Sequence, residues 1–108
     1  MRVSEFKKEH KAVYKKLQNN GMIEEYWGKD SLGCRIKLVK DLRTRIDQEG
    51  FPIVTSLYVD HFYQVFIICP WCGNIHIHGI SKSLDDPGWR TPHCNRLDSK
   101  DYYIKKED

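Results

Sequence analysis

The stretch CPWCGNIHIHG at residues 69–79, followed by TPHC at residues 91–94, limits the fold more than any other part of the chain. Its first two cysteines, Cys69 and Cys72, enclose a turn that contains a proline and is followed by a glycine. Such a turn points both sulfur atoms at one centre, and in a reducing compartment this favours a metal ion over a disulfide. The chain must therefore fold so that further ligands return to this turn.

Zinc is commonly held by four cysteine sulfur and histidine nitrogen atoms in a tetrahedron, and a structural site uses all four positions. Cys94 is the natural third ligand, because it is the only other cysteine in the second half of the chain. If the segment after Cys72 forms a strand, His76 lies one pleat repeat from the turn and His78 lies about 7 Å further on. We therefore expect Zn²⁺ bound by Cys69, Cys72, Cys94 and His76, with His78 or His93 as the alternative fourth ligand.

The same residues give little support for catalysis. A hydrolytic zinc keeps one position open for water and needs a carboxylate base close by. The chain contains neither an HExxH motif nor the zinc-deaminase pattern. Between Cys69 and Cys94 the only carboxylates are Asp85 and Asp86, in a DDPG stretch typical of a turn. We therefore expect a structural metal and no enzymatic activity.

The first half of the chain has mainly helical patterns. Residues 4–21 read as one amphipathic helix, with Ser4 as its N-cap and Gly21 at its end. Its apolar stripe consists of Phe6, His10, Val13 and Leu17. Residues 24–33 read as a connector, and residues 35–50 as a second helix, although their first half also alternates like a strand. The remaining cysteine, Cys34, is expected to be a small buried side chain.

From residue 52 onward the chain is rich in β-branched and aromatic residues, which favour strands. Residues 52–59 and 62–69 form a predicted hairpin, residues 74–80 a third strand, and residues 102–105 an edge strand. The alternation in the third strand places Ile75 and Ile77 on one face and the two histidines on the other. We therefore expect an α+β fold in which an N-terminal helix or two helices precede a small antiparallel sheet with a zinc-knuckle hairpin. The chain is expected to be a single domain over residues 1–108, with residues 1–50 mainly helical and basic and residues 51–108 forming the sheet with the zinc module.

The charge is unevenly distributed along the chain. Residues 1–50 hold twelve lysines and arginines against eight acidic residues, whereas residues 51–108 hold six against seven. Four lysines lie together on one face of the predicted first helix and could contact phosphates: Lys7, Lys8, Lys11 and Lys15. No apolar run approaches the ~20 residues that span a bilayer, and no signal peptide opens the sequence. We therefore expect a cytoplasmic protein with no membrane partner.

The last forty residues or so resemble the small zinc-binding proteins of bacteriophages and mobile elements. The resemblance rests on Cys69, Pro70, Cys72, His76, His78, Gly79, Gly88, Arg90, His93 and Cys94, and on the tyrosine-containing tail. The group includes zinc-containing anti-CRISPR proteins that bind the type II CRISPR nuclease. The resemblance thus implies a phage-encoded inhibitor that binds a host defence protein, with that nuclease as the plausible target. The N-terminal half matches no family known to us.

Two kinds of partner follow from these observations. A protein partner would be held by exposed aromatic residues, because tryptophan, tyrosine and arginine dominate interface energetics. The candidate anchors are Tyr26, Trp27, Trp71 and Trp89, of which Trp71, inside the cysteine turn, is expected to be the most exposed. The alternative is a nucleic acid bound by the lysine-rich helix, with Arg35, Arg43 and Arg45 in support.

Overall fold

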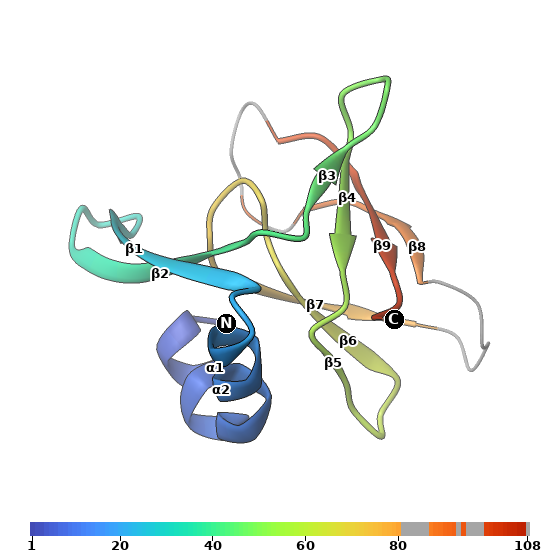
Figure 1. Cartoon of the computed structure of the whole chain (residues 1–108). Helices are drawn as coiled ribbons and strands as arrows, with labels where there is room; N and C mark the ends of the chain where they lie inside the picture. Colours follow the sequence, from blue (N-terminus) through green and yellow to red (C-terminus); the bar gives the residue numbers. More distant parts are fainter. Residues whose placement is uncertain (81–86, 93, 95–98, 108) are drawn as a thin grey trace.

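The computed structural model describes residues 1–80, 87–92, 94 and 99–107. Two short helices come first, and nine strands follow them (Figure 1), so the expected α+β class is confirmed for the described part. The helices are α1 (Val3–Glu9) and α2 (Lys11–Asn19). The strands are β1 (Ile23–Lys29), β2 (Arg35–Asp41), β3 (Arg45–Ile46), β4 (Pro52–Thr55), β5 (Tyr58–Val59), β6 (Gln64–Ile68), β7 (Ile75–Gly79), β8 (Gly88–Arg90) and β9 (Tyr102–Lys105). Neither helix is long and apolar enough to cross a membrane.

The predicted first helix is divided in two at His10, whose φ of −128° and ψ of 53° lie outside the helical region. The break is explained by packing: the His10 ring lies 4.5 Å from the Tyr58 ring and 5.4 Å from the Phe66 ring, centroid to centroid. Tertiary contacts of this kind outweigh a local helical preference. Ser4 is not the N-cap, a position that Arg2 takes, whereas the helical segment does end before Gly21 as expected.

The expected helix over residues 35–50 is wrong, and residues 1–50 are not mainly helical. Strands β1 and β2 instead form a two-stranded antiparallel ribbon, with Ile23 opposite Asp41 and Lys29 opposite Arg35. The alternating first half of the segment, residues 35–41, forms a strand because residues 23–29 pair with it. Those residues lie in the stretch that was expected to be a connector. Cys34 lies in the turn of this ribbon and is exposed, not buried.

Three hairpin turns share one design, in which an aspartate closes a five-residue turn. These aspartates are Asp30, Asp47 and Asp60. In each turn a carboxylate oxygen accepts hydrogen bonds, 2.8–2.9 Å long, from the backbone N–H groups two and four residues later. Aspartate stabilises turns in this way because its short side chain satisfies backbone donors that the strands cannot reach.

The fourth residue of each turn has a left-handed backbone. It is Gly33 (φ 81°) in the first turn, Gly50 (φ 88°) in the second and Tyr63 (φ 58°) in the third. Glycine adopts this conformation readily, whereas a residue with a side chain is strained there. Among the described residues, Tyr63 is the only one other than glycine with a positive φ.

The predicted strand over residues 52–59 changes partners halfway along. Its first part, β4, pairs in parallel with β9, with Ile53 opposite Tyr103. The backbone N–H of Ser56 still donates to the Lys105 carbonyl in β9. The N–H of the next residue, Leu57, donates to the Phe66 carbonyl, so β5 pairs with β6. Strand β9 is therefore not an edge strand: it lies between β4 and β8 in a sheet of order β3-β4-β9-β8.

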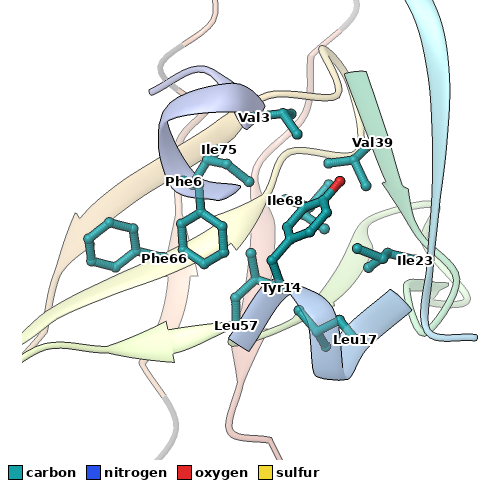
Figure 2. Packing of buried hydrophobic residues seen from close by; sticks show 10 residues of the cluster. All are labelled: Val3, Phe6, Tyr14, Leu17, Ile23, Val39, Leu57, Phe66, Ile68 and Ile75. Atoms are coloured by element: carbon teal, nitrogen blue, oxygen red, sulfur yellow. The ribbon is translucent and has the colours of Figure 1, made fainter. Parts of the chain in front are cut away.

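Strand β6 separates two hydrophobic cores, because its side chains alternate between them. Phe66 and Ile68 point to the first core, which the helices cover, as Figure 2 shows. Val65 and Ile67 point to the second core. Full burial of one such side chain contributes about 1.5–3 kcal/mol to the free energy of folding. A strand that is buried on both faces therefore contributes a large part of the stability of the protein. The first core consists of Val3, Phe6, Tyr14, Leu17, Ile23, Val39, Leu57, Phe66, Ile68 and Ile75, and the second of Val54, Val65, Ile67, Cys69, Tyr102 and Ile104.

Candidate metal centre

Three cysteines and one histidine lie together at the end of the β6–β7 hairpin. They are Cys69, Cys72, His76 and Cys94, whose potential ligand atoms all lie within 4.8 Å of one another. The sulfur atoms of Cys69 and Cys94 are 3.7 Å apart, and the Cys72 sulfur is 3.3 Å from Nε2 of His76. The structure thus brings together the four residues that the sequence analysis named first as metal ligands.

The separations suit a metal ion better than a disulfide. A disulfide would bring two sulfur atoms to about 2.05 Å. Around a tetrahedral ion with metal–sulfur distances of about 2.3 Å, two sulfurs lie about 3.8 Å apart, and a sulfur and a nitrogen about 3.6 Å apart. The cluster can therefore hold a metal ion with four protein ligands and little movement of its side chains.

The turn between Cys69 and Cys72 supports this geometry locally. The Cys69 N–H donates to the carbonyl of Asn74 at 2.9 Å, which closes the hairpin. The Gly73 N–H donates to the Cys69 carbonyl at 3.0 Å, and the Trp71 N–H lies 3.4 Å from the Cys69 sulfur. A donor aimed at sulfur helps to keep a cysteine deprotonated, which a metal ligand requires.

The two cysteines of the turn differ in acidity. A hydrogen bond from the Cys69 thiol, supported by one from His76, lowers the pKa of Cys72 to about 4. The same thiol hydrogen bond, together with burial, raises the pKa of Cys69. Cys72 is therefore the more readily deprotonated of the two cysteines. Metal binding must release the Cys69 proton, so affinity rises with pH.

Behind the cluster, a buried tyrosine links the two histidines of β7. Nδ1 of His76 is 3.1 Å from the Tyr102 hydroxyl, and Nε2 of His78 is 2.6 Å from the same oxygen. When a metal ion is bound at Nε2 of His76, the ring proton lies on Nδ1, which then donates to the Tyr102 hydroxyl, and that hydroxyl donates to Nε2 of His78. Burial raises the pKa of Tyr102, so this hydroxyl stays protonated. It can therefore accept one hydrogen bond and donate another.

Replacing Tyr102 with phenylalanine is expected to weaken metal binding about 10- to 100-fold, because the histidine would lose the partner that fixes its ring and tautomer. Competition with a calibrated chelator measures this affinity at constant pH. Tyr103→Phe is the matched control, since its side chain is half-buried and lies outside the cluster. Equal affinities for the Tyr102→Phe variant and the unmodified protein would contradict the assigned hydrogen-bond chain.

The cluster borders an open pocket of about 860 Å³, which Cys72, His76 and Cys94 help to line. Two carboxylates reach this pocket from the first half of the chain, Glu5 and Asp30. Sequence reasoning missed them because it considered only the segment between the cysteines. The Asp30 carboxylate is already committed: one oxygen holds the β1–β2 turn and the other lies 3.2 Å from the Arg2 guanidinium.

The remaining candidate ligands lie elsewhere. The structure brings His76, and not His78, together with the cysteines, because the described ring nitrogen contact of His78 is with Tyr102. The third candidate, His93, lies outside the described residues.

The candidate partner residues are also distributed differently from expectation. Trp71 is half-buried, and its indole N–H donates to the Lys100 carbonyl at 3.0 Å. Trp27 and Trp89 are about half exposed, at 54% and 51%. Trp71 is thus not the most exposed of the tryptophans, because its indole is held against the segment before β9.

Two positively charged side chains lie over the Trp27 ring. The Arg35 guanidinium and the Lys37 ammonium each lie 4.1 Å from its ring centroid. Trp89 packs edge-on against Phe51 and Tyr103. Both indoles therefore make intramolecular contacts that account for their positions.

The lysines of the predicted helix are spread over both helices. Lys7 forms an ion pair with Glu25 at 3.6 Å and lies 5.3 Å from the Tyr14 ring centroid. Lys8, Lys11 and Lys15 are exposed. Among the described residues, Lys7 is thus the one of these four lysines that forms an ion pair.

The fold and the cluster together define a small α+β protein with a candidate metal centre of three cysteines and one histidine. The chain matches no protein-family model, and comparison with curated proteins and with solved structures found no match to it.

Proposed function

We propose that the chain is a non-enzymatic binding protein stabilised by a structural zinc ion, and that it inhibits a host defence protein. The observation that carries the proposal is the four-ligand cluster of Cys69, Cys72, His76 and Cys94. Three thiolates and one imidazole are a donor set typical of structural zinc sites, which leave no position for a reacting water. A metal of this kind holds the chain in shape, so the activity belongs to the surface.

The environment of the cluster supports a structural role. A catalytic zinc needs a carboxylate base free to take a proton. Of the carboxylates that line the neighbouring pocket, Asp30 is held by a turn and by Arg2. Glu5 is exposed, as is common for a residue in the first turn of a helix.

The resemblance of the second half to phage zinc proteins supplies the target to test first, the type II CRISPR nuclease in the host cytoplasm. The alternative, a nucleic acid bound by the lysine-rich helix, loses support because Lys7 is paired with Glu25 and because the helix is broken. Three exposed lysines on two short helices form a weak site for a phosphate backbone.

The test mixes the purified, metal-loaded protein with the guide-loaded nuclease and measures complex formation by size-exclusion chromatography and inhibition of DNA cleavage. The proposal expects a stoichiometric complex and loss of cleavage at equimolar protein. Binding to free DNA is measured in parallel at physiological and at low salt. Absence of a complex, or tight DNA binding that falls steeply with salt, would rule the proposal out.

A further inference from the structure

Three positively charged side chains line a small pocket beside the sheet that contains β3, β4 and β9 (Figure 1). They are Arg43, Arg45 and Lys105, and the pocket has a volume of about 340 Å³. Met22 and Leu42 form an apolar wall on it. Sites for small molecules combine apolar walls with a few convergent polar groups, in volumes of about 300 to 1,000 Å³. The pocket therefore has the size and composition of a site for a small ligand.

The strand pairing explains why polar side chains from three strands reach this pocket. Thr55 of β4 lies opposite Lys105 of β9, and Arg45 of β3 lies opposite Ile53 of β4. Directly paired residues point to the same face of a sheet, and so do alternate residues of one strand. Because Val54 belongs to the second core, the side chains of Arg45, Thr55 and Lys105 point to the opposite face, where the pocket lies.

The pocket also contains a buried hydroxyl group that has no partner among the described residues. Thr55 is only 4% exposed, and its Oγ1 atom is buried without a hydrogen bond. An unpaired buried hydroxyl costs free energy, and buried polar groups are nearly always satisfied by a partner. Because no hydrogen bond holds this hydroxyl, the side chain can turn it toward an acceptor that enters the pocket. The missing partner is therefore explained by a ligand that accepts hydrogen bonds.

The charges around the pocket favour an anionic ligand. The charge of Arg43 is matched by Asp41, with which it forms an ion pair at 2.9 Å. Among the described residues, neither Arg45 nor Lys105 forms an ion pair. The one acidic residue of the described part that lines the pocket is Glu107, which is exposed. Two unpaired cations against one exposed carboxylate leave the pocket positively charged.

We propose that this pocket binds the phosphate group of a small molecule. The Arg45 guanidinium and the Lys105 ammonium donate charge-assisted hydrogen bonds to it, and the Thr55 hydroxyl donates another. A phosphate group offers three terminal oxygens in different directions, which suits donors from three strands better than the two coplanar oxygens of a carboxylate. Met22 and Leu42 contact the rest of the ligand. The site includes none of the four candidate metal ligands and does not depend on the proposed function.

The experiment titrates the purified full chain, with its metal, with inorganic phosphate at constant ionic strength. Backbone amide signals in NMR spectra follow the binding. The signals of residues 43–45, 55 and 105 are expected to shift and to reach saturation. Acetate, titrated in the same way, is expected to bind at least about tenfold more weakly. Shifts that do not saturate, or that saturate at other residues, would overturn the proposal, and equal affinities for acetate and phosphate would overturn the assignment to phosphate.

Two variants test the assigned donors. Thr55→Val removes the hydroxyl and is expected to weaken phosphate binding at least about tenfold, while its melting temperature stays the same or rises because an unpaired buried group is lost. Arg45→Gln is expected to weaken binding by a similar factor. The matched control is Arg35→Gln, an equal charge change at an exposed strand residue outside the pocket, with an expected change below about twofold. Unchanged phosphate affinity of Thr55→Val, or equal losses for the two arginine variants, would contradict the proposed site.

Discussion

If the cluster of Cys69, Cys72, His76 and Cys94 holds zinc as proposed, removing the ion with a strong chelator at pH 7 is expected to leave the sheet around the cysteines without a cooperative unfolding transition. The binding energy of a structural zinc is on the order of 10 kcal/mol, which is as large as the whole stability of a typical domain. Without the ion, the β6–β7 hairpin is joined to the segment before β9 by weaker links, such as the Cys69–Cys94 sulfur contact at 3.7 Å and the Trp71–Lys100 hydrogen bond at 3.0 Å. Calorimetry and circular dichroism follow the change, and elemental analysis gives the identity of the metal and the expected ratio of one ion per chain.

Two variants sharpen this test. Cys94→Ser is expected to lose most of the bound metal and to melt well below the unmodified protein. Cys34→Ser is the control, because Cys34 is exposed in the β1–β2 turn and lies outside the cluster. Its metal content and melting temperature should stay the same. If chelation leaves the melting temperature unchanged after the metal has been shown to leave, the ion does not hold the fold.

Gly73→Ala is expected to destabilise the protein by about 3 kcal/mol. Gly73 has a φ of 77°, where an added side chain costs roughly 1–2 kcal/mol. A Cβ atom at this position would also overlap the Tyr26 hydroxyl and press on Leu38, and overpacking costs about 1–3 kcal/mol more. The substitution acts where the cysteine turn meets the β1–β2 ribbon, since the Val39 N–H donates to the Gly73 carbonyl at 3.0 Å. Urea unfolding measures the change in free energy.

Gly33→Ala separates the two contributions. Its φ of 81° is as unfavourable for alanine, but a Cβ atom there would meet nothing within 4 Å. The expected loss is therefore the strain alone, roughly 1–2 kcal/mol. If the two substitutions cost the same, contact between the cysteine turn and the ribbon contributes nothing to stability.

The parts that could be predicted from the sequence have short-range causes. The turn from Cys69 to Gly73 and the alternation of Ile75 to His78 depend on neighbours along the chain, and the structure has both as expected. The helical end before Gly21 has a local cause as well. These features need only propensity and pleat periodicity, which a sequence displays directly.

The errors came from contacts between distant residues. His10 interrupts the helix because its ring packs on Tyr58 and Phe66, some fifty residues away. Residues 35–41 form a strand because residues 23–29 pair with them. The hydroxyl of Tyr102 reaches the two histidines only because β9 enters the sheet between β4 and β8. No local pattern reports such pairings, so the tyrosine behind the metal cluster could not be found from the sequence.

The insertion of β9 between two other strands also has a consequence for synthesis on the ribosome. A nascent chain that has released residue 100 but not β9 has β4 and the cysteine turn, but it lacks the strand that joins β4 to β8 and the hydroxyl that lies beside His76. Its sheet edge and second core stay open until residues 102–105 emerge, and long-range parallel pairing forms slowly. Completion of the candidate metal centre therefore has to wait until residues 102–105 have been released.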